Sequence, residues 1–492
     1  MKSIWSMETE IPGREPLKGD KKVFAVVIGA GMAGILTAYY LQKQGFEVIV
    51  LEADRIASGQ TRNTTAKITG QHELCYAKLI KRLGEERAGI YANANEGAIA
   101  EYENLIKKKK IDCHFERRNA YLYSTESAKQ LKKEAEAAQR LGIKAEFVTE
   151  TELPFEIEGA VCFRNQAQFH PLQFIKEIAR ELTIYEHTKV LSVKKNTVYT
   201  NRGKVRAEHI VFATHYPITN VPGMYFARQH QERSYVLALS GNEPLKGMYR
   251  SIDKDGLSLR SAGNILLLGG GTHRTGKSAK AQNVVAKGKP DCRGGESGAY
   301  QYLRECTKKY FPKSDEVTHW SAQDCMPHDE IPFIGRYSVF RPNWYVATGF
   351  KKWGMTTSMI AALLICDQIC GRENPYEKLF KPQRMHLWGL LSFIKDLGES
   401  VIGLSKGAFH LPISTEKNLS IGQGGIVRIG WKRYACYRDE KGNLHRISVK
   451  CPHMGCELAW NEEELSWDCP CHGSRFDYEG KLLDNPAQMD KS

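Results

Sequence analysis

A continuous run of apolar residues opens the regular part of the chain. Val23 to Ile28 is apolar throughout, as strands buried on both faces of a parallel sheet are, and a helical pattern then runs from Ile35 to Gly45. A second apolar segment, Glu47 to Leu51, leads directly to Glu52. Strand, helix and strand within about thirty residues predict a β-α-β unit of a parallel sheet.

Helical and strand patterns alternate through the middle of the chain and change near its end. The predicted helices are Ala94 to Lys110, Ser127 to Leu141 and Met359 to Cys370, and the predicted strands of an antiparallel sheet are Ser234 to Leu239, Leu257 to Ser261 and Ile265 to Leu268. After residue 416 short strand patterns alternate with turn residues. That spacing is typical of a small all-β module.

The 492 residues exceed what a single hydrophobic core spans, so we expect several parts. We predict an N-terminal extension over 1–21, a larger α/β domain with an inserted antiparallel sheet over 22–375, a connector over 376–415 and an all-β domain over 416–492. The extension is polar and has the composition of a disordered segment.

The formal net charge of +14 raises the question of an anionic partner. Because the basic residues alternate with acidic ones and form no aromatic-studded patch, we expect no nucleic-acid binding. The stretch Leu387 to Leu404 is interrupted by charges and is too polar to span a bilayer. A helix packed on its own protein is favoured there over a helix lying on a membrane surface. Met1 to Lys22 has no apolar signal segment, so a cytoplasmic location is expected.

A glycine motif joins the first strand to the first helix. Its residues are Gly29-Ala30-Gly31-Met32-Ala33-Gly34. The first glycine permits the tight turn, the second lets the backbone approach a diphosphate, and the third lets helix and strand pack closely. Glu52 follows about twenty residues later at the end of the next strand, where a carboxylate accepts hydrogen bonds from a ribose diol. The context predicts a dinucleotide site.

Four of the 13 cysteines crowd into Cys451 to Cys471, while the others are scattered. The segment from Cys451 to Cys456 reads Cys-Pro-His-Met-Gly-Cys, and the segment from Cys469 to Ser474 reads Cys-Pro-Cys-His-Gly-Ser. Two cysteines and two histidines from two loops suit either a [2Fe–2S] cluster with mixed ligands or a tetrahedral zinc site. Cysteines used only as core residues would not explain this spacing.

The two cysteine-rich segments closely resemble the Rieske signature, which favours the cluster over zinc. The resemblance implies that the [2Fe–2S] cluster is bound by Cys451, His453, Cys469 and His472. It also implies a disulfide between Cys456 and Cys471 that ties the two loops together. A cytosolic environment normally opposes such a bond.

The larger domain is similar to the D-amino-acid-oxidase-like superfamily of FAD-dependent oxidoreductases. The similarity rests on residues 52–67, on Ala213-Thr214-His215, and on 329–335 and 347–356. It implies FAD, with the diphosphate on Gly29 to Gly34. The remaining implied contacts are Glu52 at the adenosine ribose, the adjacent Ala53, Val190 at the adenine, and Gly349, Gly354 and Met355 at the distal end of the flavin.

The reaction follows only from this resemblance. Family members remove a hydride from a carbon that bears an amine, so a small amine or amino-acid-like substrate is implied. No catalytic residue can be assigned. We expect His273 or Arg274, after a predicted strand and a glycine-rich turn, to face the substrate, and the alternative is that both are exposed loop residues.

The whole chain resembles bacterial fusions of a D-amino-acid-oxidase-like domain with a C-terminal Rieske domain. The resemblance implies that electrons pass from substrate to FAD, then to the cluster, and on to an external acceptor that is a protein or a quinone. The competing hypothesis is an electron-transfer or redox-sensing protein that oxidises no small molecule.

Overall fold

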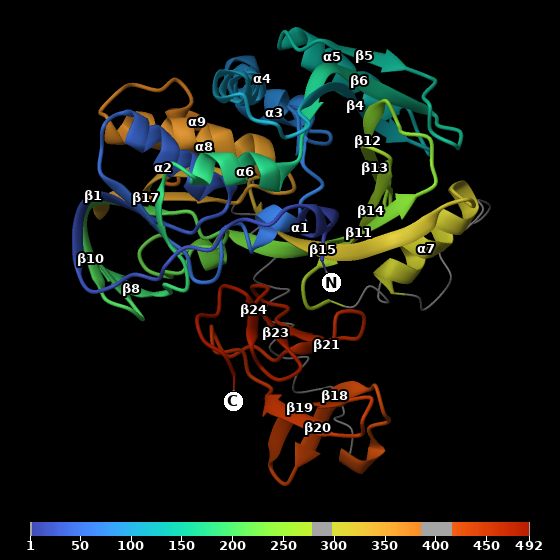
Figure 1. Ribbon diagram of the computed structural model, residues 1–492. Helices are drawn as coiled ribbons and strands as arrows, with labels where there is room; N and C mark the ends of the chain where they lie inside the picture. The colour runs from blue at the N-terminus through green and yellow to red at the C-terminus, as the bar shows by residue number, and fades with distance from the viewer. Residues whose placement is uncertain (1, 278–297, 385–415, 492) are drawn as a thin grey trace.

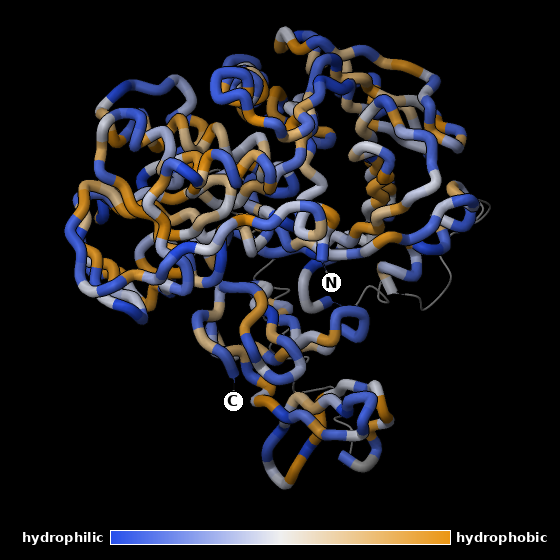
Figure 2. The backbone as a smooth tube through the Cα atoms, viewed as in Figure 1, coloured by the Kyte–Doolittle hydropathy of each residue, from blue (hydrophilic) through white to orange (hydrophobic). Residues whose placement is uncertain are grey.

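The computed structural model describes residues 2–277, 298–384 and 416–491. The larger domain contains two sheets side by side, and the C-terminal domain lies beneath them (Figure 1). Its half that contains β21 to β24 lies against the larger domain, whereas β18 to β20 point away from it. Figure 2 shows hydrophobic residues along the interior strands and helices of the larger domain.

The first sheet has eight strands within the described residues, and its central strands are parallel. In spatial order the strands are β16 (Phe333–Ser338), β17 (Arg341–Thr348), β10 (Lys204–Phe212), β1 (Lys21–Ile28), β2 (Val48–Leu51) and β7 (Thr183–Tyr185), with β9 (Thr197–Thr200) beside β10 and β8 (Val190–Lys194) beside β9. The predicted β-α-β unit is present as β1, α2 (Met32–Lys43) and β2. Its helix packs against the buried α8 (Gly354–Ile369).

The second sheet has nine strands in the described part of the chain. In spatial order they are β15 (Asp315–Pro327), β11 (Gln229–Ser240), β14 (Ile265–Arg274), β13 (Ser258–Ala262), β12 (Gly247–Ser251), β4 (Glu116–Ser124), β6 (Gly159–Gln168) and β3 (Lys67–Ile68), with β5 (Ala145–Val148) beside β6. Most pairs are antiparallel, and β4 pairs with β12 in parallel. The predicted fold class is confirmed: an α/β nucleotide-binding domain with an inserted sheet, followed by an all-β domain.

Helices cover both sheets. Besides α2 and α8 they are α1 (Ile4–Glu8), α3 (Tyr76–Leu83), α4 (Glu85–Lys109), α5 (Lys129–Arg140), α6 (Pro171–Ala179), α7 (Ala299–Tyr310) and α9 (Glu377–Phe380). Short 3₁₀ turns form at η1 (Gln60–Asn63), η2 (Tyr225–Ala227) and η4 (Glu416–Asn418). In the described ranges, none of these helices has the length and apolar character needed to cross a membrane.

The N-terminal extension is ordered, contrary to the expectation from its composition. Ile4 and Trp5 of α1 are buried, and the Trp5 indole N–H donates a hydrogen bond of 2.7 Å to the carbonyl oxygen of Thr64. The Trp5 ring also lies edge-on to His170, with 4.9 Å between centroids. Burial of a large aromatic side chain can hold a segment in place even when most of its residues are polar.

The C-terminal domain is built from two small antiparallel sheets. The first contains β18 (Gly424–Ile429), β19 (Lys432–Arg438) and β20 (Leu444–Ser448), and the second contains β21 (Ala459–Asn461), β22 (Ser466–Asp468), β23 (Arg475–Asp477) and β24 (Leu482–Asp484). Its core gathers the cysteines of residues 451–471 around Trp467 and Phe476. Most of the predicted connector, including the proposed helix over Leu387 to Leu404, lies outside the described residues.

Candidate functional site

A cavity of about 760 Å³ extends from the glycine turn across to the second sheet. That volume lies in the range of small-molecule and cofactor sites. Most of the predicted FAD contacts line it: Gly29, Gly31, Met32, Ala33, Glu52, Ala53, Val190, Gly349, Gly354 and Met355. Ala30 and Gly34 lie within the same turn but behind its cavity surface. The structure therefore collects, in one cavity, residues that are more than 300 positions apart in the sequence.

The glycine turn leaves no room for side chains where two of its glycines stand. A Cβ atom on Gly34 would lie 1.9 Å from the carbonyl oxygen of Gly29, and one on Gly29 would lie 2.5 Å from that of Ala213. Gly29 also has φ of +104°, which favours glycine. The N-cap residue of α2 is Gly31, and the N–H of Met32 donates to the hydroxyl oxygen of Thr61 at 3.0 Å. The N-terminus of the helix lines the cavity, where its dipole favours a diphosphate.

Glu52 stands at the end of β2 on the wall of the cavity. Its carboxylate accepts backbone hydrogen bonds from Ala30 at 2.8 Å and from Asp54 at 3.0 Å. Burial raises the pKa of Glu52, and these backbone donors oppose that rise by favouring the charged form. The arrangement fixes a hydrogen-bond acceptor where the adenosine ribose of a dinucleotide would lie. The tight turn, the helix N-terminus on the cavity wall and the placed carboxylate together fit FAD.

The part of the cavity beside the second sheet is lined by basic side chains. Lys67, Arg250 and Lys352 line it. The buried ammonium of Lys67 donates to the carbonyl oxygen of Tyr249 at 2.8 Å and to the hydroxyl of Ser258 at 2.7 Å. Burial, reinforced by the nearby arginines, lowers the pKa of Lys67 well below its usual value. An anion in this part of the cavity would favour the charged lysine.

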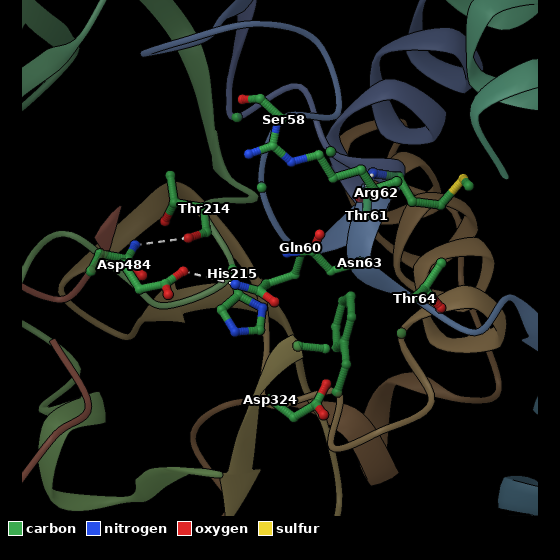
Figure 3. A pocket seen from close by; sticks show the side chains of 18 of the residues that line it. Ser58, Gln60, Thr61, Arg62, Asn63, Thr64, Thr214, His215, Asp324 and Asp484 are labelled. Atoms are coloured by element: carbon green, nitrogen blue, oxygen red, sulfur yellow. Dashed lines mark hydrogen bonds between the residues drawn. The ribbon is translucent and has the colours of Figure 1, made fainter. Parts of the chain in front are cut away.

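One carboxyl group, Asp324 of β15, lines the same part of the cavity (Figure 3). Burial raises the pKa of Asp324 to about 7, although Lys352 opposes the rise. Glu232 adds to it by like-charge repulsion. Asp324 therefore changes its charge near neutral pH, inside the cavity.

The four predicted cluster ligands lie together at one end of the C-terminal domain. Cys451 and Cys469 are buried and share a hydrogen bond between their sulfur atoms, which lowers the pKa of Cys451. The rings of His453 and His472 have centroids 4.9 Å apart and are almost perpendicular, at 88°. In the described residues the Nδ1 atoms of both histidines are buried without a hydrogen-bond partner. Two buried thiols and two buried imidazole nitrogens without partners have the chemistry of a metal cluster with mixed ligands.

The other two cysteines of the group are joined to each other. Cys456 and Cys471 form a disulfide, as the resemblance to the Rieske signature implied. The sulfur atoms of Cys456, Cys469 and Cys471 all lie within 4.8 Å of one another, so the disulfide stands directly beside the predicted cluster site. Ser474 hydrogen-bonds Cys451 through its hydroxyl, which also accepts from the backbone N–H of Ala487 at 3.0 Å. A plain zinc site would need neither feature.

Comparison with known proteins identifies both parts of the chain. Residues 25–368 match the family model described as FAD dependent oxidoreductase. The chain belongs to the FAD-dependent oxidoreductase family. Residues 410–490 match the Rieske [2Fe-2S] domain, so the predicted family, its enzyme class and its two cofactors are confirmed. We therefore call the two parts the flavin domain and the Rieske domain.

Individual relatives agree with this assignment. The chain is 36% identical over 502 residues to YhfW of Bacillus subtilis strain 168, provisionally named a Rieske 2Fe-2S iron-sulfur protein, with 99% of this chain and 96% of YhfW covered. The glycine oxidase of Geobacillus kaustophilus shares the fold with a TM-score of 0.61 and 17% identity, covering 74% of this chain and 99% of that chain. L-amino acid deaminase from Proteus vulgaris shares the fold with a TM-score of 0.58 and 17% identity, and the match covers 76% of this chain and 100% of that chain.

The prediction that His273 or Arg274 faces the substrate is wrong in this structure. Neither residue lines the cavity, although Thr272 does. His273 instead stacks on Tyr235 with 5.5 Å between ring centroids, and its Nδ1 lies 3.1 Å from the carbonyl oxygen of Gly271. Arg274 lies at the end of β14 and donates to the carbonyl oxygen of Cys471 at 3.3 Å. It contacts the Rieske domain instead.

Sequence reasoning missed that the second cluster loop lies on the flavin domain. Gln231 of β11 donates through Nε2 to the carbonyl oxygen of His472 at 2.7 Å. Gln323 of β15 donates through its Nε2 to the carbonyl oxygen of Gly473 at 2.8 Å. Both glutamines are buried, and Nε2 of Gln323 also donates to the side-chain oxygen of Gln231 at 2.6 Å. This contact between two strands carries no sequence signal.

The Rieske domain also closes one side of the flavin cavity. Its residues Lys481 to Asn485, Ala487, Gln488 and Asp490 belong to the lining. Asp484 accepts a hydrogen bond of 2.8 Å from the side chain of Gln60 (Figure 3). The side-chain amide of Asn485 donates a hydrogen bond of 2.9 Å to the carbonyl oxygen of Thr214. The cluster-binding domain and the flavin site thus share a wall.

A buried ionic network holds the two domains together. Arg233 of the flavin domain pairs with Glu464 of the Rieske domain, and all but a few per cent of both side chains is buried. Arg475 binds Glu464 at 2.8 Å and also Asp468 and Asp484 at 2.9 and 3.0 Å. Next to this network, the carboxylate of Glu463 accepts hydrogen bonds of 2.9 Å from the backbone N–H groups of Ala299 and Tyr300, the first two residues of α7. A Rieske-domain carboxylate therefore caps a flavin-domain helix.

Proposed function

We propose that the protein oxidises a small amine or amino-acid-like substrate at the flavin and passes the electrons through the Rieske cluster to an external acceptor. The observation that carries this proposal is that residues of the Rieske domain line the flavin cavity. The adjacent cluster loop is hydrogen-bonded to β11 and β15, two strands that also line the cavity. A domain that served an unrelated purpose would not need this placement.

Contacts between the cavity wall and the Rieske domain support electron transfer between the two centres. Thr214 and His215 line the cavity, and Asn485 binds the backbone on both sides of His215, at Thr214 and Tyr216. Bound FAD supplies the hydride acceptor, and it can release electrons singly to a one-electron centre. The residues around it position the substrate, exclude water and hold the cluster loop close to the cavity.

The substrate class is inferred from the basic side chains beside the second sheet. Lys67, Arg250 and Lys352 line this part of the cavity, where Arg250 pairs with Glu73 at 3.0 Å and Lys352 pairs with Glu232 at 3.1 Å. A substrate carboxylate would share these basic groups with Glu73 and Glu232. The solved structures with the same fold include a glycine oxidase and an L-amino acid deaminase, whose names both specify amino acids. An amino-acid-like anion therefore suits this cavity better than a neutral amine does.

Binding of a carboxylate should depend on the charge of Asp324. Below its pKa of about 7 the group is neutral, and above it the new carboxylate competes for Lys352 and repels an anionic ligand. We expect benzoate, used as a simple carboxylate probe of flavin absorbance, to bind severalfold more weakly at about pH 8 than at about pH 6. Asp324→Asn should remove this difference. An unchanged pH profile in the variant would show that another group is responsible.

An anaerobic screen of amines and amino acids tests the proposed function. A true substrate should bleach the flavin first and then the cluster. In a Cys451→Ser variant, which removes one predicted ligand, the flavin should still bleach while the cluster signal is absent. If dithionite reduces both centres but no member of the screen reduces either, the protein is better described as an electron-transfer or redox-sensing protein.

A further inference from the structure

One segment of the flavin domain connects the cavity wall with the cluster histidines. It begins at Thr214 and His215 on the cavity wall, continues through the fully buried Tyr216 and reaches Asn220. There the side-chain oxygen of Asn220 lies 3.0 Å from Nε2 of His453. A residue of the flavin domain thus contacts a predicted ligand that is 233 positions away in the sequence.

The same segment presents an aromatic ring to both histidines. Phe226, in η2, lies with its centroid 6.5 Å from that of His453 and 6.0 Å from that of His472. The interplanar angles are 77° and 83°, which is the edge-to-face arrangement that aromatic rings prefer. Phe226 and Asn220 therefore form a contact surface for the two cluster histidines, which we call the histidine seat.

The hydrogen bond defines which nitrogen of His453 is available to iron. An amide oxygen only accepts, so Nε2 must carry the proton. The lone pair is then on Nδ1, which is the buried nitrogen without a hydrogen-bond partner in the described residues. A partner that accepts the second N–H of a ligating histidine fixes its tautomer and makes it a stronger donor to the metal.

We propose that Asn220 is a positioning residue for the Rieske cluster, supplied by the other domain, and that its hydrogen bond to His453 lowers the reduction potential of the cluster. A more electron-donating imidazole stabilises the oxidised iron and so lowers the reduction potential. Because Asn220 belongs to the flavin domain, the potential is lowered only while the Rieske domain is docked on the histidine seat. This inference deepens the proposed electron route, but its test uses the full chain and chemical mediators, without any substrate.

The test is a mediated redox titration of the cluster in the full-length protein, with electron paramagnetic resonance spectra of the reduced state. Asn220→Ala removes the acceptor and should raise the midpoint potential, by about 59 mV if the ratio of oxidised to reduced cluster changes tenfold. Asn220→Asp provides a stronger, charged acceptor and should lower the midpoint potential. The g-values should move in both variants. Asn443→Ala, in a Rieske-domain turn where the side chain bonds Asp439, is the matched control and should leave both readouts unchanged.

Opposite shifts in the two variants would support the role of Asn220, because a merely structural defect would not change sign with the charge of the acceptor. Wild-type potentials and spectra in both variants would overturn the proposal, and so would shifts in the same direction. Failure of the substrate screen would leave this result unaffected, since mediators and not a substrate reduce the cluster.

Discussion

Replacing Glu464 by glutamine is expected to release the Rieske domain from the flavin domain. The change keeps the shape of the side chain but leaves Arg233 and Arg475 buried with one carboxylate fewer. Removing one partner of a buried ion pair costs about 3–5 kcal/mol, because the remaining charge stays desolvated. Thermal unfolding followed by the circular dichroism of the cluster should show a clearly lower midpoint.

The exposed Glu479 of the same domain supplies the control for this prediction. Glu479→Gln should unfold like the wild-type protein, and small-angle scattering should show a more extended particle for Glu464→Gln alone. Equal unfolding midpoints and equal particle dimensions for the two variants would contradict the role assigned to the network.

The same network predicts how docking responds to acid. Burial by itself raises the pKa of Glu464, but Arg233 and Arg475 outweigh it and hold the pKa at about 2, below the value of about 4.3 for a free glutamate. A depressed pKa contributes stability that is present above the unfolded value and is lost as the pH falls through the folded value. Docking should therefore weaken between about pH 4.3 and about pH 2.

Replacing Gly34 by alanine should abolish FAD binding. The added methyl group would lie 1.9 Å from the carbonyl oxygen of Gly29, which is backbone and cannot rotate away. The turn and α2 must separate, at a cost of about 3 kcal/mol or more, and the diphosphate site is lost with them. Purified protein should contain little flavin by absorbance while retaining the colour of the cluster.

Gly89→Ala is the matched control, because a Cβ atom there meets nothing within 4 Å and the residue lies inside α4. Alanine favours a helix over glycine, so this variant should keep its flavin and unfold at the same or a higher temperature. A full flavin content in Gly34→Ala would show that the turn is not the diphosphate site.

The features that could be predicted from the sequence are those encoded within short segments. The glycine turn with its β-α-β unit spans about thirty residues, and the two cysteine–histidine loops carry their chemistry in their own spacing. Such patterns are local, so neither needs knowledge of the tertiary structure. The disulfide between Cys456 and Cys471 followed from the resemblance because both cysteines belong to those loops.

The contacts that long-range packing creates could not be predicted in this way. Arg274 was one of two residues expected to face the substrate, yet it donates to the carbonyl oxygen of Cys471, because docking of the Rieske domain covers the end of β14. Asn220, which contacts His453, lies in a segment with no recognisable motif. The polar N-terminus was misjudged because a few apolar residues within it, Ile4, Trp5 and Leu17, are buried and anchor it.

The most direct test of the proposed electron route is light-driven reduction of the flavin in the anaerobic full-length protein, followed by the absorbance of the cluster. Because the Rieske domain forms one wall of the flavin cavity, the cluster should be reduced after the flavin with a first-order rate that does not depend on protein concentration. Glu464→Gln should slow this step. A cluster that stays oxidised, or a rate proportional to protein concentration, would contradict transfer within one molecule.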